Sequence, residues 1–237
     1  MKHRGARILE NSPTAPLSQS LSELLVGART VQLAVGYLFI EGLTPLLPAL
    51  RDLECSSLLI GNVVNRLPEE QIRLEQAARS TADVHGEGDS FARSVREERD
   101  RTATLTALNL RRTIDSLPRT TQIDHTVVEL SSLIASGRLQ VRVYTGGRLH
   151  AKVALVSYGE TDERAPGLAI VGSSNLTMPA DPVDYEANCD LDILLEGKEN
   201  FRRLTGWFDT YWSAAQDFQK ELFEELARRW PDEASPL

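Results

Sequence analysis

Two short runs in the second half of the chain hold residue types that could bind and attack a phosphate group. His150 and Lys152 stand two positions apart in the first run, and Asn175 ends the second, which reads Gly-Ser-Ser-Asn. An imidazole can act as a nucleophile or carry a proton, and an ammonium group supplies a positive charge. A carboxamide adds hydrogen-bond donors. If these three groups converge, they form a binding site for one tetrahedral anion.

The residues around these groups predict the strands that would position them. Apolar and polar residues alternate over 149–153, so His150 and Lys152 would share one face of a strand. Residues 168–171 are apolar and end at Gly172, which predicts a second strand that stops at a tight turn. A polar loop joins the two strands, and we expect them to pair as a hairpin.

The rest of the chain predicts an α/β domain with a central mixed sheet between helices. Over residues 30–64, a strand, a helix kinked near two prolines and a second strand imply a parallel pair of strands. Residues before Pro16 are expected to form a loose arm. Further strands are expected over 139–144 and 190–195, and further helices over 18–27, near 127–134 and within 198–229.

Residues 66–119 differ in composition and predict a helical insertion within a single domain that spans 1–237. Charged residues become frequent, strand-forming residues become rare, and two glycines near 85–90 indicate a flexible centre. The arginines over 93–101 alternate with acidic residues, which is typical of a solvent-exposed helix face, and the alternative is an arm that contacts DNA. Four apolar residues with helical spacing are predicted to face the core: Ala107, Leu110, Ile114 and Leu117.

The composition narrows the classes of function. The chain has 237 residues, enough for a sizeable core, and a formal net charge of −8 at pH 7. This charge argues against nonspecific DNA binding by the whole surface, so a phosphate ligand would need a local basic patch. Cys55 and Cys189 match neither a disulfide framework nor a zinc motif. Because no signal peptide and no run of about 20 apolar residues is evident, we expect a cytoplasmic protein without a membrane span.

His150 and Lys152, the run 172–175 and Glu186 together resemble the signature of the phospholipase D superfamily. That signature is His-x-Lys, four residues and Asp, then Gly-Ser-x-Asn, with an acidic residue about ten positions later in small nuclease members. The early strand and helix of the chain are also similar to the first β-α unit of those members. One position departs from the signature, because Ser157 stands where the family has the aspartate, which mostly supports the structure and the surroundings of the histidine.

The resemblance implies a role for each of these residues in hydrolysing a phosphodiester. His150 would attack phosphorus and form a phosphohistidine, which divides one difficult step into two. Lys152 and Asn175 would hold the non-bridging oxygens of the phosphate. Glu186 would orient the imidazole by accepting its other N–H. The substrate-binding set would be Ser173, Ser174, Lys152 and Asn175.

The chemistry needs a second histidine that protonates the leaving oxygen and later activates water. This chain contains one such motif, and His3, His85 and His125 lack the surrounding pattern. The family pairs two motifs across a twofold axis, so the resemblance implies a homodimer whose two His150 side chains meet in one shared site. It implies no metal and no other cofactor.

The leading hypothesis is a metal-independent phosphodiesterase that acts on nucleic acid, with DNA as the expected substrate and a role in restriction or defence. Such domains can precede helicase modules, so a helicase or ATPase module is a further expected partner. The first alternative is a catalytically silent DNA-binding or dimerisation module with the same fold, which Ser157 and the acidic net charge favour. The second is a phospholipid-hydrolysing enzyme, ranked lower because no interfacial amphipathic segment is evident.

Overall fold

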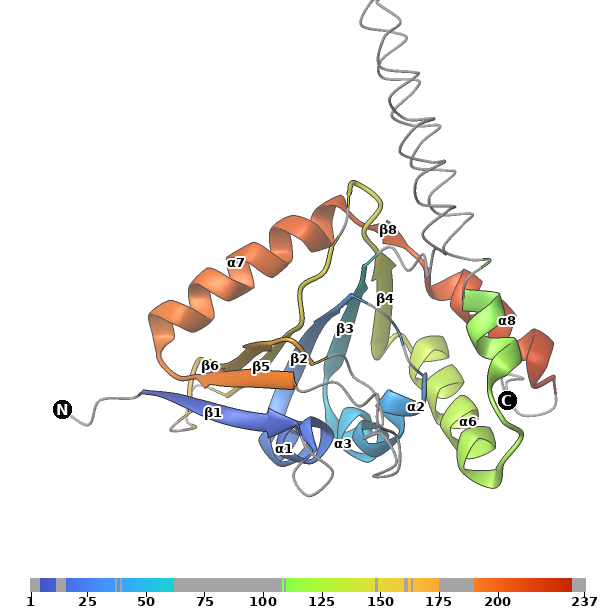
Figure 1. The fold of residues 1–237 in the computed structure, drawn as a ribbon, viewed down its shortest axis with the longest axis horizontal. Coiled ribbons are helices and arrows are strands. Elements are labelled where there is room, and N and C mark those ends of the chain that lie inside the picture. The colour runs from blue at the N-terminus through green and yellow to red at the C-terminus, as the bar shows by residue number, and fades with distance from the viewer. Residues whose placement is uncertain are drawn as a thin grey trace, which may run out of the picture.

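The computed structural model of the chain describes residues 5–11, 16–36, 38, 40–61, 108, 110–147, 149–159, 162, 164–174 and 190–231. The strands in this part of the chain are β1 (Ala6–Asn11), β2 (Ala28–Val35), β3 (Cys55–Ile60), β4 (Leu139–Val143), β5 (Val153–Tyr158), β6 (Gly167–Gly172), β7 (Asp190–Leu195) and β8 (Gln216–Asp217). They form one 8-stranded sheet in the order β1-β7-β6-β5-β2-β3-β4-β8 (Figure 1).

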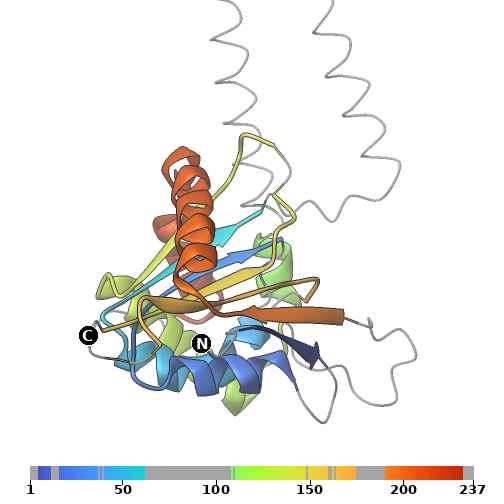
Figure 2. The ribbon, with the colours of Figure 1, turned by 90° about the vertical axis from the view of Figure 1, so that its left-hand side faces the viewer.

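The α-helices that are described over their whole length are α1 (Leu17–Leu25), α2 (Ile40–Leu43), α3 (Leu47–Asp52), α6 (Thr121–Ala135), α7 (Lys198–Ala214) and α8 (Gln219–Arg229). They cover both faces of the sheet, with α7 on one face and α1, α3 and α6 on the other (Figure 2). The predicted α/β class, a mixed sheet between helices, is confirmed.

Alternate residues of the central strands point into two separate cores. Leu33 of β2 and Leu58 of β3 belong to the larger apolar cluster beneath α1, α3, α6 and α8. Their neighbours Ala34 and Leu59 belong to the smaller cluster beneath α7. The apolar run that ends β3 is typical of a strand buried on both faces, whereas β2 could be recognised from the alternation of Val31, Leu33 and Val35.

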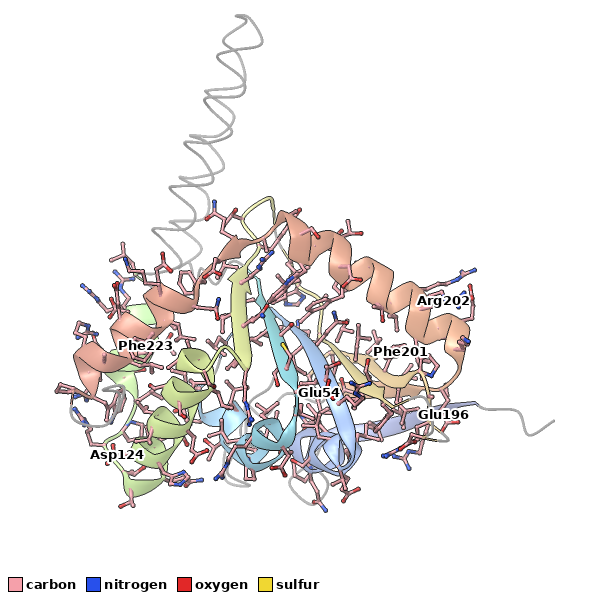
Figure 3. The ribbon with its side chains drawn as sticks, turned by 180° about the vertical axis from the view of Figure 1, so that it is seen from behind. Glu54, Asp124, Glu196, Phe201, Arg202 and Phe223 are labelled. Atoms are coloured by element: carbon pink, nitrogen blue, oxygen red, sulfur yellow. The ribbon has the colours of Figure 1, made fainter. Side chains whose placement is uncertain are left out.

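Two phenylalanines anchor α7 to the sheet. Phe201 and Phe208 are the buried residues of this helix, and Figure 3 shows Phe201 directed toward the sheet while Arg202 points away from it. A Cβ atom at Gly167 of β6 would lie 2.4 Å from the Phe201 ring, so the glycine leaves room for the aromatic side chain. Burial of each phenylalanine contributes on the order of 2 kcal/mol to stability.

The predicted pairing of the central strands is confirmed. β2 and β3 pair in parallel, and β5 and β6 form the predicted antiparallel hairpin. The chain between β2 and β3 is helical but is broken near Pro45 and Pro48 into α2, a 3-10 turn over Thr44–Leu46 and α3. Proline lacks the N–H that a continuous helix would need at these positions.

The ends of several strands meet at one edge of the sheet. β2, β3 and β4 run parallel and finish there, whereas β5 runs antiparallel to β2 and starts there. β6 returns to the same edge, and β7 starts from it. The register places Val153 between Ala34 and Val171, and it places Gly172 beside Asp192. Residues just before β5, just after β6 and at the start of β7 therefore lie near one another.

The expectation of a loose arm before Pro16 is wrong, because β1 pairs antiparallel with β7 along its whole length. The apolar pattern of β1 is weak: Leu9 is buried, whereas Ile8 is 65% exposed at the edge of the sheet. An edge strand of this kind is held by backbone hydrogen bonds to a partner far away in sequence. Its own side chains therefore carry little information about the pairing.

The expectation that residues 149–152 belong to a strand is also wrong, because β5 begins at Val153. The chain leaves β4 and must cross the ends of β3 and β2 before it can pair beside β2. It passes directly over Gly61, where an added Cβ atom would lie 2.1 Å from the carbonyl oxygen of Leu149. His150 and Lys152 are therefore carried by this crossing segment.

Most of the predicted insertion over 66–119 lies outside the described residues, as does Ala107. At its end, residues 110–116 are helical, and the prediction that Leu110, Ile114 and Leu117 face the core is confirmed because all three are buried. Among the helices described, none is both long and apolar enough to span a membrane.

Candidate active site

The ammonium group of Lys152 lies against the imidazole of His150. Its Nζ atom is 2.9 Å from Nε2 and 3.1 Å from Nδ1 of the ring, and it donates to the His150 carbonyl oxygen at 3.1 Å. A ring nitrogen that accepts from an ammonium group must carry its lone pair at that position. The contact therefore places the imidazole of His150 directly beside a cation.

The two side chains differ in their exposure to solvent. His150 is exposed, whereas Lys152 is 8% exposed. Burial lowers the pKa of Lys152, and the carboxylate of Asp190 opposes that shift. The imidazole is thus accessible to a large substrate, while the positive charge is enclosed and directed toward the sheet edge.

The sheet fixes the position of Lys152. Its carbonyl oxygen accepts a hydrogen bond of 3.2 Å from the backbone N–H of Gly172, at the end of β6. The next residue, Val153, is paired on both sides, with Ala34 of β2 and Val171 of β6. The backbone of Lys152 therefore moves with the edge of the sheet.

The turn after β6 is tied to the start of β7. The backbone N–H of Ser173 donates to the Leu191 carbonyl oxygen at 3.2 Å. The Ser173 hydroxyl donates to Oδ1 of Asp190 at 2.8 Å and accepts from the Leu191 N–H at 3.0 Å. These bonds bring Ser173 and Asp190 to the same edge as Lys152.

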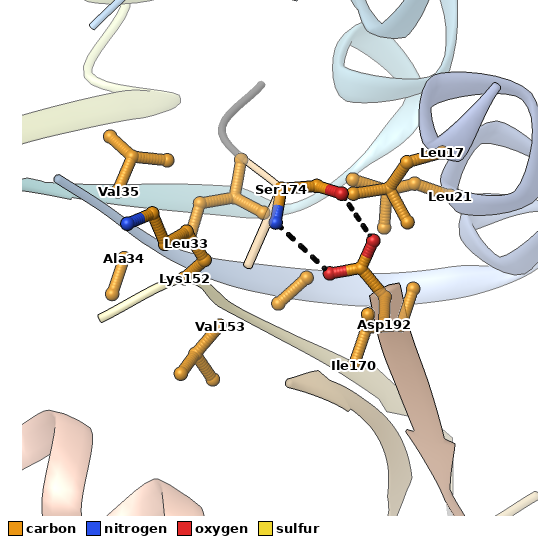
Figure 4. A pocket seen from close by; sticks show the side chains of 11 residues that line it. Leu17, Leu21, Leu33, Ala34, Val35, Lys152, Val153, Ile170, Ser174 and Asp192 are labelled. Carbon is orange, nitrogen blue, oxygen red and sulfur yellow. Dashed lines mark hydrogen bonds between the residues drawn. The ribbon is translucent and has the colours of Figure 1, made fainter. Parts of the chain in front are cut away.

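Asp192 holds the same turn from the buried side. It is 1% exposed, and its carboxyl accepts from the Ser174 N–H at 3.3 Å and from the Ser174 hydroxyl at 2.5 Å (Figure 4). Burial raises the pKa of Asp192, while the hydrogen bonds from Ser174 act in the opposite direction. Asp190 also raises the pKa of Asp192, because a nearby negative charge disfavours the ionised form of a carboxyl group.

A cavity lies between Lys152 and Asp192. Lys152, Ser174 and Asp192 line it together with apolar residues from α1, β2, β5 and β6 (Figure 4). In this view the Lys152 ammonium lies on the side of Val35, and the hydrogen-bonded pair of Ser174 and Asp192 lies on the other side. Most of the cavity lining is apolar, and Lys152 and the Ser174–Asp192 pair are its polar residues.

The sequence interpretation did not identify Asp190 or Asp192. The apolar alternation of β7 lies on the exposed side, since Leu191 is 52% and Ile193 37% exposed. The buried side carries Asp192 instead. Two acidic residues two positions apart in an otherwise apolar strand are the signal that could have revealed a buried polar network.

The structure brings four of the expected site residues to one edge: His150, Lys152, Ser173 and Ser174. The hydroxyl groups of both serines donate to aspartates of β7. Asn175 and Glu186 lie outside the described residues, and their roles remain predictions. The remaining described histidine, His125, lies on α6 with Nε2 4.0 Å from Glu129. Within the described residues, no three His, Cys, Asp or Glu side chains gather in a way that could hold a metal ion.

Ser157, which stands where the signature has aspartate, lies near the far end of β5. It pairs with Thr30 and Gly167, whereas the site is at the start of the strand. Ser157 comes five positions after Lys152 along extended chain, a distance of about 16 Å at ~3.3 Å per residue. The serine therefore leaves the described contacts of His150 and Lys152 unchanged.

No family model matches the chain, and no curated protein matches its sequence. Several solved structures resemble its fold. Nuc, a phospholipase D family member from Salmonella typhimurium, is 10% identical with a TM-score of 0.48, over 90% of this chain and 97% of Nuc. NucT from Helicobacter pylori is 12% identical with a TM-score of 0.42, over 90% of this chain and 99% of NucT. Phosphatidylserine synthase from Haemophilus influenzae Rd KW20 is 13% identical with a TM-score of 0.47, over 97% of this chain and 47% of the synthase.

At identities of 10%, 12% and 13% and TM-scores of 0.48, 0.42 and 0.47, these similarities concern the arrangement of helices and strands. A shared fold does not carry a shared chemistry. The activity of this chain has to be inferred from its own residues.

Proposed function

We propose that this chain is a metal-independent phosphodiesterase that cleaves nucleic acid, with DNA as its substrate. The observation that carries the proposal is the contact between the Lys152 ammonium and the His150 imidazole, at 2.9 and 3.1 Å, on an open sheet edge. A nucleophile beside a buried cation is suited to an anionic ester, whose own charge repels other nucleophiles. The exposed position of His150 admits a polymer as well as a small molecule.

The first step is the attack of His150 on phosphorus. A phosphodiester bound at the edge takes over the hydrogen bonds of the Lys152 ammonium, which releases the ring nitrogen toward phosphorus. A nitrogen–phosphorus bond forms, and the bond between phosphorus and the leaving oxygen breaks with both electrons on that oxygen. Lys152, with Asn175 as its predicted partner, stabilises the charge on the non-bridging oxygens.

The second step is hydrolysis of the phosphohistidine. A second imidazole, after it has protonated the leaving oxygen, accepts a proton from water, and that water displaces His150 from phosphorus. The His125 side chain is on α6 beside Glu129 and so does not serve this purpose. We assign the second imidazole to His150 of another copy, in a homodimer whose twofold axis passes between the two histidines. Glu186 is the predicted partner of the other ring N–H.

Cleavage in EDTA tests the proposal. Supercoiled plasmid and a labelled single-stranded oligonucleotide are incubated with wild-type protein, His150→Ala, Lys152→Ala and the control His125→Ala, whose side chain is 70% exposed on α6. We expect loss of cleavage in His150→Ala, a loss of about 10²- to 10³-fold in Lys152→Ala, and no change in His125→Ala. Wild-type protein that is folded but cleaves neither substrate would refute the proposal.

The shared site has its own test. Wild-type and His150→Ala proteins are mixed in known ratios and allowed to exchange subunits. If two copies of His150 act together, activity falls with the square of the wild-type fraction, because each active dimer needs two intact subunits. A linear fall, or a protein that sediments only as a monomer while it cleaves DNA, contradicts the dimer.

The alternative of a phospholipid-hydrolysing enzyme is tested with phosphatidylcholine vesicles, for which we expect no hydrolysis.

A catalytically silent DNA-binding or dimerisation module with the same fold is the second candidate, and Ser157, which stands where the signature has an aspartate, favours it. Wild-type protein that binds the oligonucleotide in EDTA but never cleaves it identifies this function. A helicase or ATPase module would then be the partner that acts on the bound DNA.

A further inference from the structure

β7 carries a buried carboxyl group that takes no part in the proposed chemistry. Asp192 is 1% exposed, as buried as the apolar Leu194 that follows it on the same face of the strand. Transfer of a carboxyl group into a protein interior costs several kcal/mol unless hydrogen bonds compensate for the lost water. Both carboxyl oxygens are compensated by one residue, since Oδ1 accepts from the Ser174 N–H and Oδ2 accepts from its hydroxyl.

The neighbouring strand is shaped to admit this carboxyl group. Asp192 is the cross-strand partner of Gly172. A Cβ atom at Gly172 would lie 1.8 Å from Oδ1 and 2.6 Å from Cγ of Asp192. The side chain of Asp192 therefore passes over the bare backbone of Gly172 to reach Ser174. The glycine, the serine and the aspartate therefore form one packed unit.

We propose that Asp192 is a positioning residue for the phosphate site: it fixes the turn 172–174, which holds the backbone of Lys152 through Gly172 and carries Ser173. This inference rests on the proposed function and names a residue that the chemistry needs but that touches no reacting atom. The Gly172 N–H of this turn donates to the Lys152 carbonyl oxygen at 3.2 Å. A turn that is locked at Ser174 therefore limits how far Ser173 and the backbone of Lys152 can shift.

The placement of Asp192 separates this role from a direct catalytic one. In the cavity of Figure 4 its carboxyl faces Ser174, and the Lys152 ammonium lies on the other side near Val35. Asp190 is the outer counterpart, because it holds Ser173 from the exposed side of the turn at 2.8 Å. The turn is thus held by two aspartates of β7, and Asp192 is the one that solvent does not reach.

Two substitutions at Asp192 test whether the site needs the hydrogen bonds of this side chain or its negative charge. Asp192→Asn keeps the shape, and its carboxamide can accept from the Ser174 N–H and donate to the Ser174 hydroxyl. Asp192→Ala removes both contacts. We expect Asp192→Ala to lower kcat about 10- to 100-fold with KM changed little, because a misplacement of about 1 Å can cost 10²-fold. We expect Asp192→Asn to retain kcat within about threefold, and the exposed Asp209→Ala on α7 to match wild type.

Hydrogen exchange provides a readout that does not depend on activity. In wild-type protein and Asp192→Asn, the amide of Ser174 should be protected because the residue 192 side chain accepts from it. In Asp192→Ala we expect faster exchange at residues 173 and 174, while β5 and the first half of β6 stay protected. Should Asp192→Ala fail to fold, Ser174→Ala takes its place, since it removes the hydroxyl contact and leaves the backbone amide.

The outcomes separate this inference from the proposed function. Wild-type protein that cleaves DNA, with a folded Asp192→Ala that cleaves equally well, overturns the positioning role and leaves the activity standing. A folded Asp192→Asn as inactive as Asp192→Ala also overturns it, because charge and not position would then be required. If the wild type cleaves nothing, unchanged exchange at residues 173 and 174 in Asp192→Ala overturns the inference, and faster exchange there supports the anchoring of the turn while the proposed function fails.

Discussion

Replacement of Gly172 by alanine would place a methyl group inside the space of the Asp192 carboxyl. The added carbon would lie 1.8 Å from Oδ1 and 2.6 Å from the Leu191 carbonyl oxygen, whereas nonbonded heavy atoms pack at about 3.5 Å. Strands β6 and β7 would have to separate by more than an ångström or Asp192 would have to abandon Ser174. Overpacking in a core costs about 1–3 kcal/mol, and this contact is with backbone as well as side chain, so we expect about 3 kcal/mol.

Urea unfolding, followed by circular dichroism, measures this loss, and Gly206→Ala is the matched control. Gly206 lies in α7 with open space around its Cα, so alanine there should stabilise the protein by up to about 1 kcal/mol through helix propensity. In the Asp192→Ala background, Gly172→Ala should lower the free energy of unfolding by less, because the added methyl group no longer meets the Asp192 carboxyl. A Gly172→Ala protein within about 0.5 kcal/mol of wild type would refute the close approach of Asp192 to β6.

Two further changes test the fold away from the site. Thr120 caps α6 by accepting from the Ile123 N–H at 3.2 Å, so Thr120→Ala should lower the free energy of unfolding by about 1 kcal/mol in the same urea titration. A value that is indistinguishable from wild type would contradict the cap. Hydrogen bonds from Arg164 lower the pKa of Asp162 from 3.8 to about 2. This pair therefore stabilises the fold above pH 3.8 and loses its effect as the pH falls toward 2, so wild type should lose stability over that interval more steeply than Asp162→Asn.

The sequence predicted those parts of the fold in which local pattern and burial agree. Leu33 belongs to an alternating apolar pattern and Leu58 to an apolar run, both are buried, and their strands pair as expected. The buried positions of Leu110, Ile114 and Leu117 follow from helical spacing alone. In each case the side chains that define the pattern are the same ones that fill the core.

The prediction failed where position is set by distant parts of the chain. β1 has one buried apolar side chain, Leu9, and is held in place by its backbone bonds to β7. Residues 149–152 alternate like a strand, yet the strand order forces them to cross over Gly61 instead of pairing. Local alternation cannot report a crossing that depends on the order of strands in the sheet.

The candidate site also contains residues that the local sequence identifies and residues that only the fold identifies. His150 and Lys152 could be named from their types and spacing, and the structure places them in contact. Asp192 could not, because its role depends on Gly172 of β6 and on Ser174, which only the register of β6 and β7 brings together. The roles of Asn175 and Glu186 stay predictions.

The crossing segment gives the two reactive groups different mobility. The backbone of Lys152 is bonded to Gly172 and its side chain is buried, so the movement of its charge is restricted. His150 is an exposed side chain outside the strands, and such side chains reorient within picoseconds to nanoseconds. The nucleophile can therefore swing from cation to phosphorus without any backbone rearrangement, and a change in the length of the connection after β4 would adjust its reach while the cation stays where it is.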